Sequence, residues 1–432
     1  MPQGKRHVSS PHRRARRRHG TGHHDGRTGG RLTRRAGAGP VRRDAARADL
    51  ATFEAGIVRD SRGVKLGGVG SGLFPAGRPG VYWMVTDRGP NGEPKVNGEK
   101  RRTFPVPEFA PAIVRVAVRD GKARIVRSIP LKKSDGTPIT GLSNQAGHDE
   151  TPYTWDGLTR LSYDPNGLDT EDVVTDGHDG FWLVDEYSPS LVHVAGDGRV
   201  KARYVPKGLG LTGAGYPVHE TLPAVFATRQ QNRGIEALGI SPAERALYLA
   251  VQSPLANPDK ATGKASSVAR ILRVDLRTGR PTGEWAYKME DVATFDPAAE
   301  QGDMKISALT VLRPGRLLLQ ERTDAVSRLY TVDLRKATDL LGGVHDDPAT
   351  TPSLEAALPA DVTVAAKSLA VDLAAIDGLP GKIEGVAVLD PKTIAVANDN
   401  DFGLGTFGPD GRLVDSGVTS RILTIRLPRP LR

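Results

Sequence analysis

Residues 235–252 read IEALGISPAERALYLAVQ, two short apolar runs joined by a polar turn, and a third run, RILRVDLRTG, follows at 270–279. Runs of this length that are rich in β-branched and aromatic residues, and bounded by Gly, Pro, Asp or Asn, indicate β-strands. The third run ends in Thr278-Gly279, a pair that suits a hairpin turn. The stretch therefore predicts a sheet in which consecutive strands are neighbours.

The same order of runs recurs five times. The first runs are LGGVGSGL (66–73), DGLTRLSY (156–163), IEALGIS (235–241), ISALTVL (306–312) and IEGVAVL (383–389). The second runs are VYWMVTDRG (81–89), GFWLVDEY (180–187), ALYLAVQ (246–252), RLLLQER (316–322) and TIAVANDND (393–401). A four-stranded propeller blade needs only about 40–50 residues, and these repeats are longer, so long loops must separate the strands.

This repeat predicts an all-β fold, a β-propeller of five or six blades with long inter-strand loops. A pair of β-sandwiches is the competing architecture, but it does not explain why one order of runs recurs. A strand at 54–59 is expected to pair with the last blade and close the ring.

The charge is concentrated at the N-terminus. Residues 1–50 hold 14 Lys/Arg and three acids, whereas the remaining residues carry 46 bases and 47 acids. The N-terminal tail (residues 1–50) has almost no large apolar residues and is expected to be disordered, with an arm for nucleic acid or an anionic surface as the alternative. Residues 51–432 form the expected propeller domain, for which the charge balance indicates no nucleic-acid partner.

Composition excludes several classes of protein. The 432 residues include no cysteine, which excludes a disulfide scaffold, a thiolate nucleophile and a Cys-ligated metal. No apolar run reaches the ~18 residues of a transmembrane helix. The tail holds no apolar stretch typical of a signal peptide. Nothing in the sequence indicates oligomerisation, so a monomer is expected.

Acidic residues occupy equivalent positions of the repeat, and a propeller brings equivalent positions together around one axis. They are Asp156, Glu236 and Glu384 in the first runs, with Asp87, Asp185, Glu186, Glu321 and residues 398–401 after the second. Clustered carboxylates need a cation, a base or protonation, and Ca²⁺ favours such oxygen ligands. The expected calcium ligands are Asp87, Asp185, Glu236, Glu384, Asp399 and Asp401. The loop DPNGLDTED (164–172) is a second oxygen-rich candidate. Alternatively, these acids cap turns and pair with arginines.

Basic residues recur beside the acids. They are Arg88, Arg233, Arg322, Lys305 and Lys382. Arg binds phosphate oxygens in a bidentate manner and Lys adds a point charge, so these residues are expected to bind an anionic ester. Ordinary salt bridges to the acids are the alternative.

Five ordered blocks carry a resemblance to a known family. They are TDRGP (86–90), GFWLVDEYSPSL (180–191), NRGIEAL (232–238), ISAL (306–309) with LLQER (318–322), and KIEGVAV (382–388) with NDNDFG (398–403). The chain resembles the phytase-like family, described as "esterase-like activity of phytase". The resemblance implies a β-propeller, phosphoesterase activity that depends on acidic residues, and an extracellular or periplasmic location.

The resulting hypothesis is a secreted, Ca²⁺-dependent hydrolase of phosphate esters. Glu236 or Glu384 would act as base, and Asp87, Glu186 and Glu321 are further catalytic candidates. The substrate would be a small anionic molecule. Two alternatives remain: a propeller lactonase or carboxylesterase, and a non-catalytic binding propeller with structural calcium.

Overall fold

Antiparallel sheets form wherever the repeat occurs, because each apolar run pairs with the run before it. The computed structural model describes residues 47–50, 68–408 and 411–431, all within one unit, Pro40–Arg432. The expected disorder of the tail lies outside the described residues, except that its last four form a strand, β1 (Arg47–Leu50).

Five blades contain nearly all the strands, and blades 1 and 5 are joined edge to edge in one eight-stranded sheet. Blade 1 consists of β2 (Ser71–Pro75), β3 (Val81–Val85), β7 (Ala112–Arg119) and β8 (Lys122–Pro130). Blade 2 consists of β10 (Thr170–Thr175), β11 (Phe181–Asp185), β12 (Ser190–Val194), β13 (Val200–Pro206) and β14 (Val218–Leu222). Blade 3 consists of β15 (Ile235–Ser241), β16 (Ala246–Val251), β17 (Val268–Asp275) and β18 (Pro281–Lys288). Blade 4 consists of β19 (Lys305–Arg313), β20 (Arg316–Arg322), β21 (Ser327–Asp333) and β22 (Ala366–Asp372). Blade 5 consists of β23 (Ile383–Asp390), β24 (Thr393–Asn398), β27 (Arg421–Arg426) and β1.

The remaining elements lie in the loops. Three two-stranded ribbons pair β4 (Lys95–Val96) with β5 (Glu99–Lys100), β6 (Arg102–Phe104) with β9 (Pro152–Thr154), and β25 (Leu404–Phe407) with β26 (Leu413–Asp415). The helices are α1 (Lys260–Ala265), α2 (Val292–Phe295) and short 3-10 turns at Ala224–Thr228, Gln301–Asp303, Val344–Asp346, Leu373–Ala375 and Asp401–Gly403. Every helix in the described part of the chain is too short and too polar to traverse a bilayer.

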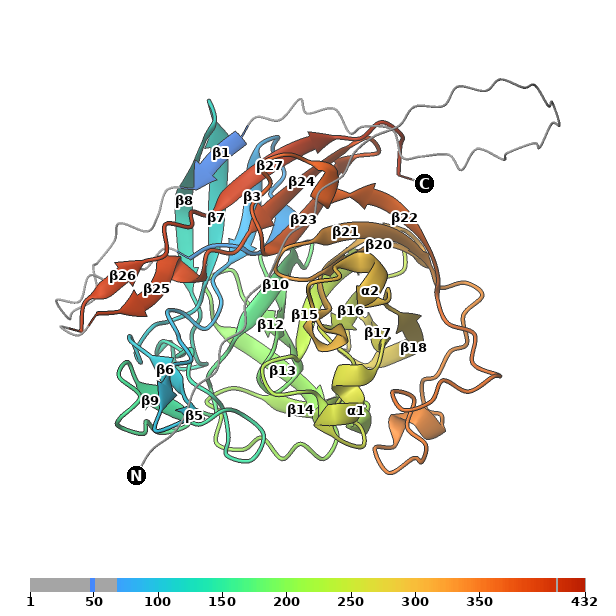
Figure 1. Ribbon diagram of the computed structural model, residues 1–432, viewed down its shortest axis with the longest axis horizontal. Helices are drawn as coiled ribbons and strands as arrows, with labels where there is room; N and C mark the ends of the chain where they lie inside the picture. The colour runs from blue at the N-terminus through green and yellow to red at the C-terminus, as the bar shows by residue number, and fades with distance from the viewer. Residues whose placement is uncertain (1–46, 51–67, 409–410, 432) are drawn as a thin grey trace, which may run out of the picture. The chain divides into compact units, whose positions relative to one another are not determined.

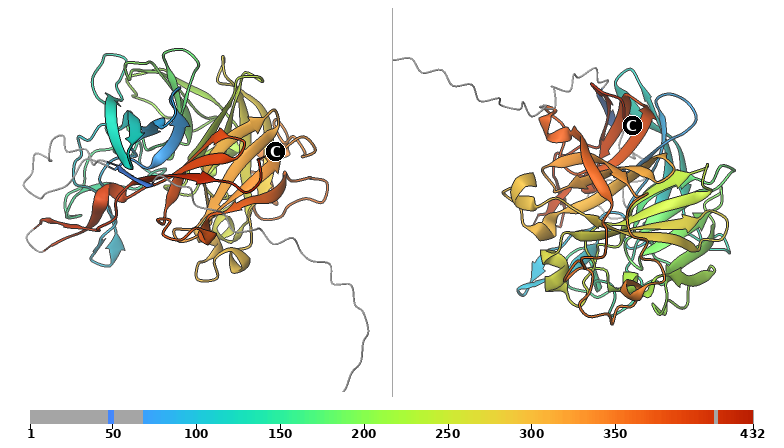
Figure 2. Two further views of the ribbon diagram at one scale, coloured as in Figure 1. Left: turned by 90° about the horizontal axis from the view of Figure 1, so that it is seen from above. Right: turned by 90° about the vertical axis from the view of Figure 1, so that its right-hand side faces the viewer.

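The first strands of the blades form a closed ring around a central channel. Each of β2, β10, β15, β19 and β23 contacts the next, and β23 contacts β2 again. The turned views of Figure 2 show blade 2 in green and blade 4 in orange as separate sheets. The chain is therefore a five-bladed β-propeller, and both the six-bladed alternative and the sandwich pair are wrong.

Apolar clusters between consecutive blades hold the ring together. Val85 of blade 1 packs in one cluster with Leu183 of blade 2, and Leu318 of blade 4 packs in another with Val396 of blade 5. The largest cluster joins blades 2, 3 and 4. Because each sheet is apolar on both faces, a blade is stable only between two others.

The ring is closed by β1. It pairs antiparallel with β27 and parallel with β8, so it joins the outer edges of blades 5 and 1 (Figure 1). The predicted closing strand at 54–59 lies outside the described residues.

One predicted strand is wrong. Residues 156–163 form a turn and loop, with Leu158 exposed, and the innermost strand of blade 2 is β10. The apolar residues of LTRLSY (158–163) resemble those of a strand, whereas the strand TEDVVT (170–175) carries two acids that weaken its apolar pattern. Those acids are buried in the channel, which is why the sequence pattern misses this strand.

Candidate functional site

β-Bulges at the start of the inner strands direct side chains into the channel. In three blades the bulge falls on a glutamate: Glu171 in β10, Glu236 in β15 and Glu384 in β23. A bulge inserts one unpaired residue and re-aims its side chain. The equivalent bulges contain Ser307 in blade 4 and Gly72 in blade 1. The charges of Glu236 and Glu384 both act on Glu171, so glutamates from three blades meet near the axis.

A compact carboxylate cluster, Asp169, Glu171 and Glu186, lies at this end of the channel. One oxygen from each residue lies within 4.8 Å of the other two, and all three residues are buried. Glu171 is 7% exposed. No hydrogen bond or ion pair is made by its carboxylate to any described residue. Burial raises the pKa of Glu171 well above its ordinary value, and the neighbouring carboxylates raise it further.

Arg88 holds two members of this cluster. Its Nη2 lies 2.5 Å from Asp169 Oδ2 and 3.4 Å from Glu186 Oε2, and its backbone N–H donates to Asp169 Oδ1 at 3.0 Å. Glu150 lies 3.7 Å from Nη1. Nη2 of Arg88 is therefore occupied by carboxylates, whereas its Nε and Nη1 are buried without a hydrogen-bond partner in the described part of the chain.

Asp185 supports the cluster from behind. Its carboxylate accepts from the Asp169 N–H at 2.7 Å and lies 2.5 Å from Nη2 of Arg203, with both side chains fully buried. Burial raises the pKa of Asp185 to about 6 although Arg203 opposes the shift. The structure thus places this predicted metal ligand in a buried ion pair, from which it positions Asp169.

Gln252 and Ser307 link the glutamates of neighbouring blades. The Gln252 amide donates to Glu186 at 2.5 Å and to Glu236 at 2.7 Å. The Ser307 hydroxyl donates to the other Glu236 oxygen at 3.1 Å. Both oxygens of Glu236 therefore have donors, whereas Glu171 has none.

Glu384, Arg322 and Lys382 form the opposite side of the site. Arg322 Nη2 is hydrogen-bonded to Glu384, and its Nε donates to Ser307 at 2.8 Å. Burial raises the pKa of Glu384 to about 7, although Arg322 and Lys382 lower it. Lys382 Nζ lies 3.1 Å from Asp399 and 2.5 Å from Asp401. The two predicted calcium ligands of this loop are thus paired with a lysine.

The remaining basic residues that were predicted to bind an anionic ester, Arg233 and Lys305, differ in their surroundings. Arg233 uses Nη1 to bind Ser253 Oγ at 2.9 Å and Gly302 O at 2.5 Å, and its other guanidinium nitrogens have no partner among the described residues. Burial lowers the pKa of Arg233. Lys305 pairs with the exposed Asp324 at 3.1 Å. Arg233, which is only partly buried, therefore retains two guanidinium nitrogens that could bind a ligand.

Two of the acidic residues predicted for the site, Asp87 and Glu321, lie in different surroundings. Asp87 is half-buried, and burial followed by the charges of Asp399 and Asp169 raises its pKa, so it lies between the two sides of the site. Glu321 does not join the site: its carboxylate accepts from Tyr287 and Lys367, each at 2.5 Å. Along β20, Glu321 and Arg322 point to opposite faces, so only Arg322 reaches the channel.

Sequence reasoning missed Asp169 and Glu171 as individual residues. The loop 164–172 was recognised as rich in oxygen ligands, but the inner strand of blade 2 was assigned to 156–163. The available signal was the match of TED at 170–172 with IEA at 235–237 and IEG at 383–385. Each triplet places a glutamate second in an inner strand.

The phytase-like family model, "Esterase-like activity of phytase", matches residues 64–402. The match spans most of the propeller and includes every residue of the site described above. The chain therefore belongs to the phytase-like family.

Individual proteins are more distantly similar to this chain. An "Uncharacterized secreted protein" of Arthroderma benhamiae is 26% identical over 330 residues, which are 65% of this chain. The chain spans 64% of the length of that relative. The β-propeller domain of Cps50 from Myceliophteria thermophila is 14% identical, covering 86% of this chain and 98% of its own, with a TM-score of 0.32. The calcium-binding protein regucalcin from Agrobacterium tumefaciens is 11% identical, covering 85% and 97%, with a TM-score of 0.34.

Proposed function

We propose that this chain is a cation-dependent hydrolase of anionic esters, with phosphate esters as the first substrate class. The observation that carries the proposal is Glu171, a buried carboxylate without a partner, whose oxygen lies within 4.8 Å of oxygens from Asp169 and Glu186. A buried charge of this kind is costly unless something compensates it. Family membership supports an ester hydrolase as the class of enzyme.

The donor set fits a hard divalent cation such as Ca²⁺. Asp169, Glu171 and Glu186 offer only carboxylate oxygens, the ligands that Ca²⁺ prefers. Asp169 and Glu186 would be shared with Arg88, while Glu171 would be available entirely to the ion. A cation bound here would neutralise the cluster and attract a phosphate oxygen.

The chain's own residues supply the other functions of a hydrolase. Arg233 would bind the anionic group through the guanidinium nitrogens that it does not use on Ser253 and Gly302. Glu384 would transfer a proton near neutral pH, since its pKa is raised to about 7. Arg322 would keep Glu384 oriented rather than clamp phosphate.

A panel of phosphate monoesters and diesters tests the proposal on the full chain, with and without EDTA. We expect EDTA-sensitive hydrolysis that Glu171→Gln abolishes. Glu99→Gln is the matched control, because that side chain is 78% exposed and its ion pair with Arg101 is long, at 3.8 Å. Hydrolysis of lactones with no activity on the phosphate esters would favour a lactonase instead.

A binding propeller with structural calcium is the second candidate. It is favoured by Arg88 and Arg322, whose guanidinium groups already contact carboxylates. In that case calcium raises the melting temperature while no substrate turns over.

Export and a monomeric state complete the proposal. The relative from Arthroderma benhamiae is described as secreted, which supports an extracellular location for this chain. Fractionation of the native host and light scattering of the purified chain test these two points.

A further inference from the structure

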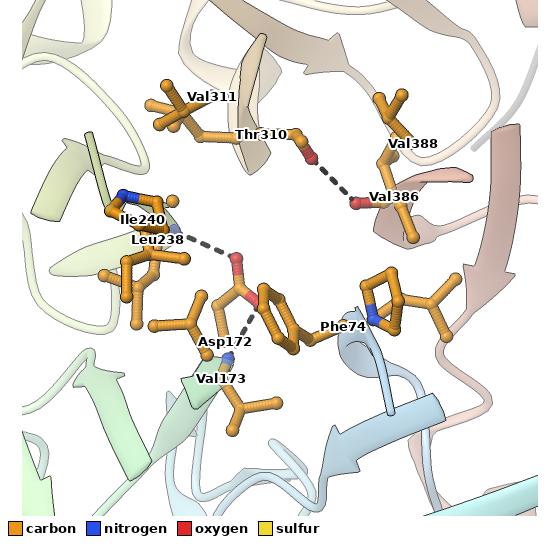
Figure 3. Close-up of a pocket in the computed structure, with 16 residues that line it drawn as sticks. Phe74, Asp172, Val173, Leu238, Ile240, Thr310, Val311, Val386 and Val388 are labelled. Atoms are coloured by element: carbon orange, nitrogen blue, oxygen red, sulfur yellow. Dashed lines mark hydrogen bonds between the residues drawn. The ribbon is translucent and has the colours of Figure 1, made fainter. Parts of the chain in front are cut away.

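A cavity lies further along the channel, beyond the acidic cluster. All five inner strands contribute to its wall, and its volume is about 260 Å³. The wall is mostly apolar, with Phe74 from β2, Leu238 and Ile240 from β15, and Val311 from β19 (Figure 3). These residues follow the bulges along the same strands, so this cavity is separate from the site proposed for hydrolysis.

One carboxylate lies in this apolar wall. Asp172 is 5% exposed, and its oxygens accept from the N–H groups of Val173 at 2.8 Å and Leu238 at 2.9 Å (Figure 3). No cationic side chain in the described ranges pairs with it. Burial raises the pKa of Asp172 well above its ordinary value, and Glu236 raises it further. A carboxylate oxygen has two acceptor positions, so each oxygen can accept one more donor.

The neighbouring strand makes room for this carboxylate. Gly72 has a φ of +67°, and a Cβ at this position would lie 2.7 Å from Asp172 Oδ1. The bulge in β2 and the absence of a side chain there let the carboxylate lie in the cavity wall between β2 and β15.

We propose that this cavity binds a small organic ammonium ion. The ammonium group would donate to Asp172, and its alkyl part would lie against the apolar wall. In a medium of low dielectric an isolated carboxylate is unfavourable, and a cation with an apolar body compensates the charge without bringing water. The proposal is independent of the hydrolase function.

Isothermal titration of the full chain at pH 7 with butylammonium and with 1-butanol tests the proposal. We expect the ammonium ion to bind at least about tenfold more tightly. Equal affinities for the two compounds, or no binding of the ammonium ion at millimolar concentration, would overturn the proposal.

Three variants distinguish the loss of ligand binding from a failure to fold. Asp172→Asn should remove the preference for the ammonium ion, and Val311→Phe should fill the cavity and abolish binding while Asp172 is intact. Asp176→Asn is the matched control, because Asp176 also accepts two backbone N–H groups but lies outside the cavity. Unchanged binding in Val311→Phe would overturn the proposal even if Asp172→Asn fails to fold.

Discussion

Replacing Glu171 with glutamine is expected to stabilise the protein in the absence of a divalent cation. Glu171 is buried without a partner, and burial raises its pKa well above the ordinary value of 4.5. For an acid whose folded-state pKa is raised, stability is retained below the unfolded pKa and is lost as pH rises through that value. The wild-type protein therefore loses stability from about pH 4.5 upward, and the variant does not.

The size of the effect follows from the same linkage. At pH 7 the unfolded carboxyl has lost its proton, whereas burial and the neighbouring carboxylates oppose that loss in the folded protein. The effect at pH 7 is bounded by the distance of that pH from the ordinary pKa of 4.5, which is about 2.5 pH units, each worth about 1.36 kcal/mol. The variant is thus expected to be more stable than the wild type by up to about 3 kcal/mol at pH 7, and equally stable at pH 4.

Urea unfolding of the wild type and the variant at pH 4 and pH 7 in EDTA measures the difference in their free energies of unfolding. The same experiment with Ca²⁺ measures how each protein responds to the ion. With Ca²⁺ the order should reverse, because the ion stabilises the wild type by mass action and the variant has lost one ligand. Lower stability of the variant in EDTA at pH 7 would refute the account of Glu171 as an uncompensated charge. An equal response of both proteins to Ca²⁺ would refute its role as a ligand.

Three further predictions concern other parts of the molecule. Glu384→Gln should remove an inflection near pH 7 from the pH–rate profile for phosphate-ester hydrolysis, because the pKa of Glu384 is raised to about 7, and an unchanged profile would exclude this proton donor. Asp185→Asn should lower the free energy of unfolding by about 3–5 kcal/mol, measured with urea, because it leaves the buried Arg203 without its counter-charge. Deletion of residues 1–50 should lower the melting temperature relative to deletion of residues 1–46, because only the longer deletion removes β1 from between blades 1 and 5. Equal melting temperatures of the two deletion variants would argue against closure of the ring by β1.

Several site residues could be predicted because strand periodicity places them in equivalent blade positions. Glu236 and Glu384 each stand second in an inner strand, and Arg88 follows the second strand of its blade, so alignment of the repeats was sufficient to select them. Glu171 escaped that alignment because the first strand of blade 2 was placed too early in the chain.

The roles of these residues could not be predicted in the same way. A sequence shows that an arginine is next to an aspartate in the chain. It does not show which carboxylate forms an ion pair with that arginine in the folded protein. Glu321 and Asp185 occupy related positions at strand ends, yet one binds Lys367 and the other binds Arg203, each away from the channel. Pairing between residues far apart in the chain depends on how the blades pack.

The sequence by itself determined the all-β class, the repeat and most strands, since these follow from local patterns of apolar residues and turns. Tertiary structure alone decided that there are five blades, that β1 joins the first to the last, and that Asp169, Glu171 and Glu186 come within 4.8 Å of one another. The physical reason is that bulges and blade packing set the direction of each side chain, and both depend on contacts between distant segments.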